Sequence, residues 1–127
     1  MIDLATLYRH YIDCLNRQAW DVLGQWVAED VHYNGKHVGL DGYRAMLERD
    51  FRDIPDLSFN IALLVADAQT VAARLAFDCS PSGVFLGVAV NGRRVQFSEN
   101  VFYQYQDEKI AQVWSVLEKT AVEAQIG

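Results

Sequence analysis

The spacing of apolar residues changes near the middle of the chain, and this change limits the possible folds more than any other feature. In the first half, apolar residues recur every three or four positions, as at Leu4, Leu7 and Tyr11, which is the spacing of one helix face. In the second half they alternate along the chain, as at Phe59 and Ile61, which is the spacing of a half-buried strand. This order predicts an α+β fold, with helices packed on an antiparallel sheet.

Three helices are expected before the sheet. The first covers residues 2–15 with Asp3 as its N-cap, the second is capped by Asn16, includes Val27 and ends at Glu29-Asp30, and Asp41 caps the third. Ile54-Pro55-Asp56 ends the third helix, because the residue before a proline is disfavoured in a helix.

Strands are expected at residues 31–33, 57–63, 71–77, 93–105 and 109–120. A turn at residues 106–109 joins the last two into a long hairpin, and Asn34-Gly35 and Asn91-Gly92 mark two further turns. A chain of 127 residues fits one domain, so a single domain is predicted over residues 1–127.

The chain is acidic, with seventeen Asp and Glu against eleven Lys and Arg and a net charge of −6. A surface of this sign repels phosphate groups, which argues against nucleic acid and anionic membranes as partners. The apolar runs fall far short of the ~20 residues that span a bilayer, and the N-terminus lacks the pattern of an export signal. A cytoplasmic location is predicted.

The sequence lacks the usual cofactor and nucleophile motifs. It contains no Gly-x-Ser-x-Gly, phosphate loop or dinucleotide fingerprint, and its three histidines have no metal-binding spacing. Cys14 and Cys79 form no Cys-x-x-Cys pair, which indicates reduced, buried thiols. Neither a cofactor nor a metal is expected, so the chemistry left is cofactor-independent proton transfer.

Two glutamates of the last hairpin are the first candidates for this chemistry. If the ladder runs regularly from the pair Tyr105 and Ile110, Glu99 and Glu118 become diagonal neighbours on one face. Apolar surroundings and mutual repulsion would raise their pKa values toward neutrality, as an acid and a base require. A slip of one residue would disperse the set over both faces. Five neighbours on that face are expected to line a substrate pocket: Phe97, Val101, Tyr103, Trp114 and Val116.

Each candidate also has a purely structural interpretation. Glu99 or Glu118 could lie at a solvated edge or in a surface ion pair. His32 could assist proton transfer or be an ordinary core histidine. Trp114 could line the pocket and raise the pKa of the Glu118 carboxyl, or belong to the core. Five tyrosines could polarise a carbonyl but also fit the core: Tyr8, Tyr11, Tyr33, Tyr43 and Tyr103.

The order of elements and three motifs resemble one known family over nearly the whole chain. The motifs are Ile54-Pro55-Asp56-Leu57, the stretch Gly83-Val84-Phe85-Leu86-Gly87 with Asn91-Gly92-Arg93-Arg94-Val95, and the closing run Lys109-Ile110-Ala111-Gln112-Val113-Trp114-Ser115-Val116-Leu117-Glu118. They are similar to the SnoaL-like polyketide and ester cyclases of the nuclear transport factor two-like superfamily. The resemblance implies a cone-shaped fold whose curved sheet encloses one apolar pocket, with a catalytic acid at Glu118. Glu118 stands where aspartate is more usual, and Glu108 where glycine is more usual.

The superfamily includes cyclases, isomerases, dehydratases, epoxide hydrolases and non-enzymes, so three functions remain open. The first is a cofactor-independent cyclase or isomerase, in which Glu118 or Glu99, assisted by His32, moves a proton on a small apolar carbonyl compound. The second is a non-catalytic module that binds such a ligand, and the third is a dimerisation scaffold.

Two surfaces outside the pocket are expected to have roles of their own. The apolar loop Val84-Phe85-Leu86 covers the pocket mouth or packs on a partner subunit. A homodimer is expected through the opposite sheet face, formed by Ser98, Asn100, Phe102, Gln104, Val113 and Ser115.

Overall fold

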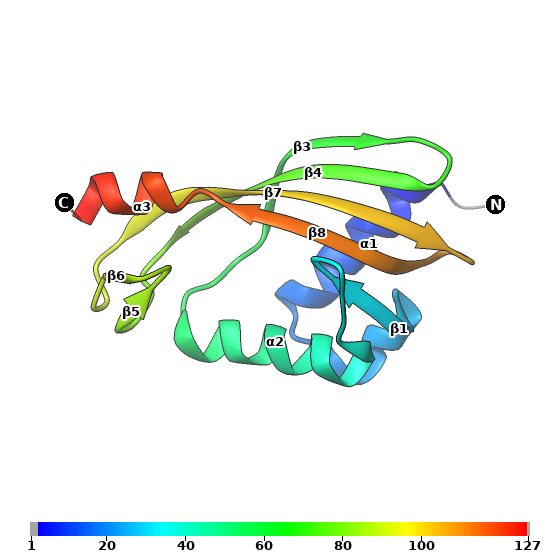
Figure 1. Cartoon of the computed structure of the whole chain (residues 1–127), viewed down its shortest axis with the longest axis horizontal. Coiled ribbons are helices and arrows are strands. Elements are labelled where there is room, and N and C mark those ends of the chain that lie inside the picture. Colours follow the sequence, from blue (N-terminus) through cyan, green and yellow to red (C-terminus); the bar gives the residue numbers. More distant parts are fainter. Residues whose placement is uncertain (1–2, 127) are drawn as a thin grey trace.

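A curved sheet organises the computed structural model, which describes residues 3–126 (Figure 1). Its strand order is β2-β1-β8-β7-β4-β3. A separate small hairpin consists of β5 (Val84–Phe85) and β6 (Val88–Ala89). The strands of the main sheet are β1 (Val27–Tyr33), β2 (Lys36–His37), β3 (Asn60–Ala66), β4 (Thr70–Cys79), β7 (Val95–Gln106) and β8 (Lys109–Leu117).

The predicted α+β class is confirmed, but the sheet is mixed and not wholly antiparallel. β1 runs parallel to β8, while all other neighbours in the sheet are antiparallel. β1 and β8 are far apart in the sequence, and no hairpin turn fixes their relative direction. The spacing of apolar residues therefore could not reveal that the two strands are parallel.

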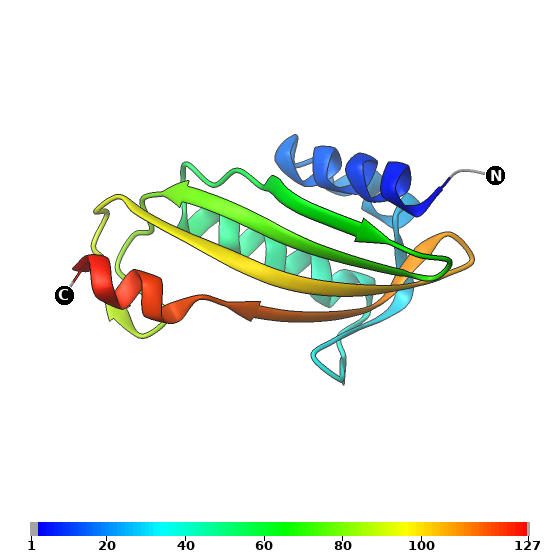
Figure 2. The ribbon, with the colours of Figure 1, turned by 90° about the horizontal axis from the view of Figure 1, so that it is seen from above.

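Two helices pack their apolar stripes against the inner face of the sheet (Figures 1 and 2). They are α1 (Leu4–Asn16), capped by Asp3 as predicted, and α2 (Gly39–Asp53). Asp41 lies in the first turn of α2, and Val38 occupies the N-cap position instead. No helix within residues 3–126 is both long and apolar enough to cross a membrane.

The second predicted helix is a short 3-10 helix, η1 (Trp20–Gln25), and Asn16 does not cap it. The side chain of Asn16 instead bonds the backbone of Phe59: its Oδ1 accepts from the Phe59 N–H at 2.7 Å, and its Nδ2 donates to the carbonyl at 2.9 Å. Asn16 therefore ties the end of α1 to the start of β3.

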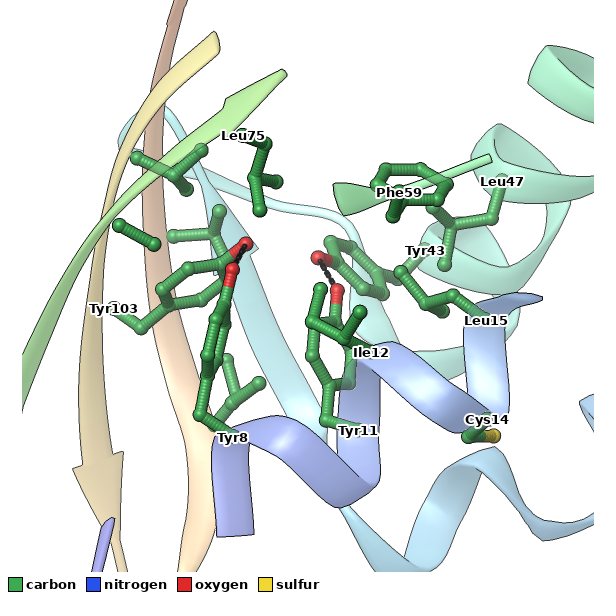
Figure 3. Packing of buried hydrophobic residues seen from close by; sticks show 14 of the residues in the cluster. Tyr8, Tyr11, Ile12, Cys14, Leu15, Tyr43, Leu47, Phe59, Leu75 and Tyr103 are labelled. Carbon is green, nitrogen blue, oxygen red and sulfur yellow. Dashed lines mark hydrogen bonds between the residues drawn. The ribbon is translucent and has the colours of Figure 1, made fainter. Parts of the chain in front are cut away.

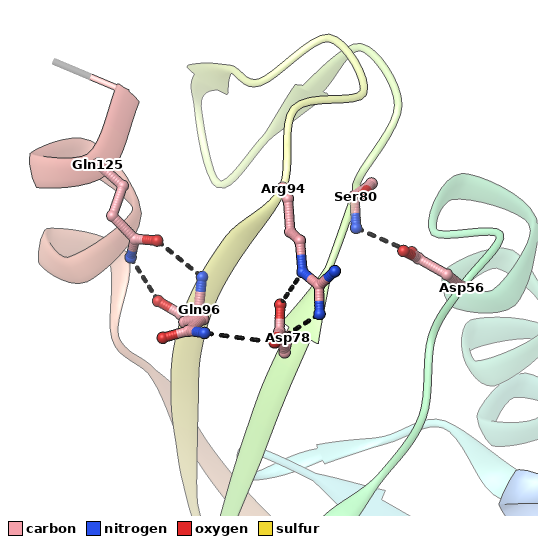
Figure 4. Close-up of polar contacts among 6 residues, drawn as sticks. All are labelled: Asp56, Asp78, Ser80, Arg94, Gln96 and Gln125. Carbon is pink, nitrogen blue, oxygen red and sulfur yellow. Dashed lines mark hydrogen bonds and ion pairs between the residues drawn. The ribbon is translucent and has the colours of Figure 1, made fainter.

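A C-terminal helix, α3 (Lys119–Ile126), replaces the predicted end of the last strand. Among the described residues of this helix, Val122 alone is fully buried. The sequence of α3 therefore lacks the repeated apolar positions by which a helix is usually predicted. Its Gln125 side chain accepts from the Gln96 N–H at 2.8 Å and donates to the Gln96 carbonyl, as a neighbouring strand would (Figure 4). These bonds hold α3 beside the start of β7.

A β-bulge decides which side chains of the last hairpin face the core. Tyr105 pairs with Ile110 as predicted, but Gln104 pairs with Gln112, which leaves Ala111 as an extra residue on β8. Every later residue of β8 is shifted by one position, so the predicted register is wrong beyond the bulge. Because side chains alternate along a strand, this single residue exchanges the two faces of β8.

The turn before the bulge is a tight one with two residues in the left-handed region. Asp107 has a φ of 53° and Glu108 a φ of 63°. The left-handed region costs a residue with a side chain about 1–2 kcal/mol, which explains why glycine is the more usual residue at the position of Glu108.

Beneath the sheet, the core contains a cluster of buried tyrosines (Figure 3). The hydroxyl of Tyr8 on α1 donates to that of Tyr103 on β7 at 3.1 Å, and Tyr11 on α1 bonds Tyr43 on α2 at 2.6 Å. Burial raises the pKa of each of these hydroxyls, so all four remain neutral donors and acceptors. The four hydroxyls of this cluster thus satisfy one another as two hydrogen-bonded pairs.

Candidate functional site

A cavity of about 210 Å³ lies between the inner face of the sheet, α2 and the β5–β6 hairpin. Apolar and aromatic side chains dominate its walls, with Glu99, Asp50 and Tyr33 as the main polar groups. Small-molecule sites commonly have this composition, since the apolar walls bind and a few polar groups orient the ligand. Among residues 3–126, the lining set is Tyr33, Met46, Asp50, Ile54, Leu57, Phe59, Phe77, Phe85, Phe97, Glu99 and Leu117.

Glu99 is the carboxylate that β7 directs into this cavity. Its Oε2 accepts a hydrogen bond from the hydroxyl of Ser115, the residue that the bulge turns inward on β8. Burial raises the pKa of Glu99 above its ordinary value, the Ser115 hydrogen bond opposes this rise, and the charge of Asp50 adds to it. Glu99 therefore keeps a proton to a higher pH than an exposed glutamate does.

Ser115 is itself held in place from the neighbouring strand. Its backbone N–H donates to Oδ1 of Asn34 at 2.9 Å. The backbone N–H of Asn34 donates to the carbonyl of Val113 at 2.8 Å, so the turn between β1 and β2 is anchored to β8. The hydroxyl that contacts Glu99 is thus oriented by a second layer of bonds.

Asp50 is the second carboxylate of the cavity, and the sequence analysis missed it. Solvent reaches its side chain, yet enough protein surrounds the carboxyl that burial raises its pKa to about 6, with Arg49 opposing and Asp53 adding to the shift. A signal for it exists in the sequence. Asp50 stands four residues after Met46 and four before Ile54, on the apolar stripe of α2, where a carboxylate is unexpected.

Tyr33 brings a hydroxyl group to the same cavity. Burial raises its pKa, Ser115 opposes the rise, and the charges of Glu99 and Asp50 add to it. Its hydroxyl therefore stays protonated and can donate a hydrogen bond to a ligand oxygen. The sequence analysis included Tyr33 only as one of several tyrosines that also fit the core.

Glu118 lies on the opposite face of the sheet, in contact with Arg74 of β4. Both of its carboxylate oxygens are 3.2 Å from Nη2 of Arg74, whose Nη1 donates to Oδ1 of Asn100 at 2.9 Å. The two charged side chains are 36% and 40% exposed, which describes a surface ion pair. The predicted sharing of one pocket by Glu99 and Glu118 is wrong in its geometry, because the bulge separates them.

The residues predicted to line the pocket are also divided between the two faces. Phe97 lines the cavity. Val101 and Tyr103 point to the same side but are buried deeper, at 2% and 3% exposure, and Tyr103 belongs to the tyrosine cluster. Trp114 and Val116 face outward, at 41% and 68% exposure, because each follows the bulge.

His32 does not lie among the described lining residues. On β1 it alternates with Val31 and Tyr33, which face inward, and its ring centroid lies 5.0 Å from that of His37 on β2. Within residues 3–126, no three His, Cys, Asp or Glu side chains are grouped so that they could hold a metal ion.

A larger depression of about 940 Å³ lies at the other end of the sheet, between the β3–β4 and β7–β8 turns. Four of its lining side chains are carboxylates: Asp3, Asp67, Asp107 and Glu108. Backbone hydrogen bonds lower the pKa of both Asp3 and Asp67, so these two are ionised near neutrality. Such a surface does not suit an apolar ligand, and the smaller cavity is the better candidate site.

Comparison with known proteins identifies the family. The family model for SnoaL-like polyketide cyclases matches residues 5–126, and the chain belongs to this family. The crystal structure of a SnoaL-like polyketide cyclase from Agrobacterium tumefaciens strain C58 is similar over the full length of both chains, with 54% sequence identity and a TM-score of 0.99.

More distant structures share the fold alone. IdmH from Streptomyces antibioticus, a candidate polyketide cyclase, is 18% identical with a TM-score of 0.83, and 98% of each chain is covered. AclR from Streptomyces galilaeus, a candidate hydroxylase, is 20% identical with a TM-score of 0.77, covering 98% of this chain and 95% of that one. None of the curated proteins matches the chain. Likeness of this degree does not fix a reaction, so the site must be argued from its own residues.

Proposed function

We propose that this protein is a cofactor-independent acid/base enzyme of the cyclase or isomerase type, acting on a small apolar carbonyl compound in the cavity beside Glu99. The observation that carries the proposal is the Glu99 carboxyl, half-buried among aromatic walls with Asp50 and Tyr33 lining the same space. The proposal keeps Glu99 and Phe97 from the sequence analysis. It assigns the supporting roles to Asp50 and Tyr33 in place of Glu118 and His32.

The two carboxyls have different surroundings, which suits an acid and a base. Asp50, with a pKa of about 6, is mostly ionised at neutral pH and can remove a proton from the carbon next to the carbonyl. The C–H bond breaks, an O–H bond forms on Asp50, and the electron pair moves to the carbonyl oxygen. That oxygen receives a proton from Glu99 in its protonated form, which the raised pKa of its carboxyl favours, or a hydrogen bond from Tyr33.

The resulting enol has two outcomes that match the reaction types of the family. Its carbon can attack a second carbonyl group of the same molecule, which forms a ring bond. The enol O–H proton then returns to Glu99, and the proton held by Asp50 passes to the new alcohol oxygen. Alternatively its carbon takes a proton back at a different position, which isomerises the compound. In both cases the carboxyls end in their starting protonation states, and no electrons are exchanged with a cofactor.

Proton abstraction can be tested without knowledge of the natural substrate. The probe is 2-tetralone in D₂O, and the measurement is the loss of its α-proton signals by NMR, corrected for buffer catalysis. Glu99→Gln and Asp50→Asn should each slow the enzyme-dependent exchange by about 10²–10⁴-fold, the usual contribution of a general acid or base.

Two further variants make the exchange experiment specific. Glu123→Gln, on the exposed side of α3, is the matched control and should exchange at the wild-type rate. Glu118→Gln tests the other candidate glutamate and should also exchange at a rate near that of wild type. Unchanged exchange in Glu99→Gln, or a large loss only in Glu118→Gln, would contradict the proposal.

A non-catalytic binding module is the second candidate, and the same apolar cavity supports it. In that case the carboxyls and Tyr33 would only orient the ligand. The two functions separate cleanly in the experiment above, because a binding module would hold 2-tetralone without accelerating exchange at its α-carbon.

We further propose a homodimer through the outer face of the sheet. Phe102, Trp114 and Val116 of β7 and β8 lie on this face and are 55%, 41% and 68% exposed, and Leu63 and Val65 of β3 are 60% and 59% exposed. Exposed apolar groups of this kind are typical of an interface. Val113 and Ser115, predicted for this interface, face inward instead. Sedimentation equilibrium should give twice the chain mass, and a monomer at high concentration would contradict the dimer.

The proposal also includes the absence of any cofactor or metal and a cytoplasmic location. Exchange activity should survive dialysis against EDTA, and fractionation of the source cells should recover the protein with the cytoplasmic fraction. A loss of activity that metal ions restore would contradict the cofactor-independent mechanism.

A further inference from the structure

The walls of the cavity consist of aromatic rings that fix one another in place. Phe85 lies 5.1 Å from Phe97 between ring centroids, Phe97 stacks on Phe77 at 5.0 Å with an interplanar angle of 18°, and Phe77 meets Phe59 edge to face at 5.3 Å. Each ring limits the movement of the next, so the wall resists expansion around a large ligand.

The volume of the cavity restricts its ligand to a small molecule. Drug-sized ligands occupy pockets of about 300–1,000 Å³, and a cavity of about 150 Å³ lined by apolar side chains accommodates benzene. At about 210 Å³, this cavity has room for one substituted ring or for two fused rings. Three or four fused rings exceed this volume, so part of a larger ring system would have to lie outside the cavity.

The charged groups of the cavity restrict the ligand further. Glu99 and Asp50 are its two ionisable acids, and no Lys, Arg or His stands among the described lining residues. An anionic ligand would meet like charge without a positive partner, which costs binding energy in a partly desolvated site. An anionic ligand is therefore disfavoured, and the uncharged carbonyl compound of the proposed function avoids this repulsion.

Phe85 occupies a position from which it can set the size limit. It is the one lining residue of the β5–β6 hairpin, and several bonds at the base of that hairpin hold it in place. The N–H and hydroxyl of Ser82 donate to the carbonyl of Asp53 at 2.9 and 2.8 Å. The N–H of Ser80 donates to Oδ1 of Asp56 at 2.8 Å (Figure 4). The hairpin is thus attached to the end of α2, and the Phe85 ring is held against Phe97.

We infer that the ligand of this cavity is a neutral, flat carbonyl compound, or its enol, of one ring or two fused rings, and that Phe85 is the residue that excludes larger ring systems. The carbonyl part of this inference rests on the proposed function, whereas the limits on size and charge rest on the cavity alone. A compact aromatic ketone fits the stacked rings of the wall and leaves its oxygen available to Glu99, Asp50 and Tyr33.

A series of matched ligands tests the size limit by binding, independently of turnover. The probes are acetophenone, 2-acetylnaphthalene and 2-acetylanthracene, which add one ring at a time to the same acetyl group, and affinities are measured by calorimetry. The one-ring or the two-ring ketone should bind, and the three-ring ketone should bind at least about tenfold more weakly than the better of these. The anion 2-naphthoate should likewise bind at least about tenfold more weakly than 2-acetylnaphthalene.

Substitution of Phe85 assigns the size limit to one residue. Phe85→Ala should remove the discrimination, so that 2-acetylanthracene binds about as well as 2-acetylnaphthalene. The matched control is Val84→Ala, since Val84 is the adjacent residue of β5, is 69% exposed and does not line the cavity. This variant should keep the wild-type preference.

Three results would overturn the inference. They are equal binding of the two-ring and three-ring ketones to the wild-type protein, an unchanged preference in a folded Phe85→Ala variant, and no binding of the one-ring and two-ring ketones at millimolar concentration. Failure of the proposed function is distinguishable, because Glu99→Gln could keep full exchange activity while the size and charge limits hold.

Discussion

The inner and outer faces of the sheet each present one glutamate of the last hairpin, and the two have opposite surroundings. On the inner face, Glu99 lies in an aromatic cavity, bonded to the Ser115 hydroxyl, with a raised pKa. On the outer face, Glu118 is partly exposed and paired with Arg74. The same side chain thus serves as a candidate proton carrier on one face and as a surface ion pair on the other.

This difference shows that location, more than residue type, determines what a carboxyl group can do. A surface ion pair contributes only about 0–1 kcal/mol, because water solvates both charges and screens their attraction. A carboxyl with aromatic neighbours loses that solvation, and its proton affinity rises. One extra residue, Ala111, turns Glu118 to the outer face, whereas Glu99 on β7 stays on the inner face.

Insertion of one alanine after Gln112 should break the distinction between the faces with the largest effect. The added residue would shift the rest of β8 by one position, turning Trp114 inward and Val113 outward. We expect the variant to lose cooperative thermal unfolding, as measured by circular dichroism. Insertion of one alanine after Ala68 in the exposed β3–β4 turn is the control and should keep a cooperative transition. A cooperative transition at the wild-type temperature in the β8 insertion variant would contradict the importance of the register.

Truncation of two adjacent aromatic residues on β7 should show how differently the inner and outer faces contribute to stability. Tyr103 is 3% exposed and bonded to Tyr8, whereas Phe102 is 55% exposed on the other face. Tyr103→Ala should lower the free energy of unfolding by about 3–5 kcal/mol, as expected for a large core side chain. Phe102→Ala should lower that of the monomer by less than about 1 kcal/mol. Urea denaturation of dilute protein measures both, and equal losses would contradict the assignment of the two faces.

Asp50, which lines the cavity on the inner face, should make the stability of the protein depend on pH, with a smaller effect than the changes above. The pKa of Asp50 is raised from 3.8 to about 6 in the folded protein, so the folded state binds its proton more tightly than the unfolded chain does. The resulting stabilisation is present below the unfolded value and is lost as pH rises through about 6. Asp50→Asn should therefore raise the melting temperature relative to wild type at about pH 8, by an amount that shrinks toward about pH 4.

Asp30→Asn is the matched control for the pH experiment, because Asp30 lies on β1 and does not line the cavity. This variant should not show the same pH-dependent gain. A gain for Asp50→Asn that stays constant from acid to alkaline pH would show that burial does not raise the pKa of Asp50.

The sequence predicted the framework of the fold because that framework depends on local patterns. The helical spacing in α1, the Asp3 cap, the strand alternation in β4 and β7 and the pair of Tyr105 with Ile110 are all readable within short windows. The bulge at Ala111 and the parallel pairing of β1 with β8 depend on contacts between distant segments. No local spacing specifies them, and the site predictions that needed a regular register went wrong for this reason.

The candidate site was predictable only where a polar residue interrupts an apolar pattern. Glu99 stood out in an apolar strand, and Asp50 carries the same signal on the apolar stripe of α2, where it was not recognised. Ser115 was assigned to the outer face because its orientation follows from the bulge. Phe85 was expected at the pocket mouth or at a subunit contact, and its distance to Phe97 supports the first of these.

Titration of Glu99 by carbon-detected NMR of the side-chain carboxyl tests the central claim most directly. The Glu99 signal is assigned by its absence in Glu99→Gln, and its chemical shift is followed with pH. Our account predicts a midpoint above the ordinary value of 4.5, because burial outweighs the Ser115 hydrogen bond. A midpoint at or below 4.5 would contradict it, since Glu99 would then be a solvated carboxylate and could not hold a proton for catalysis near neutral pH.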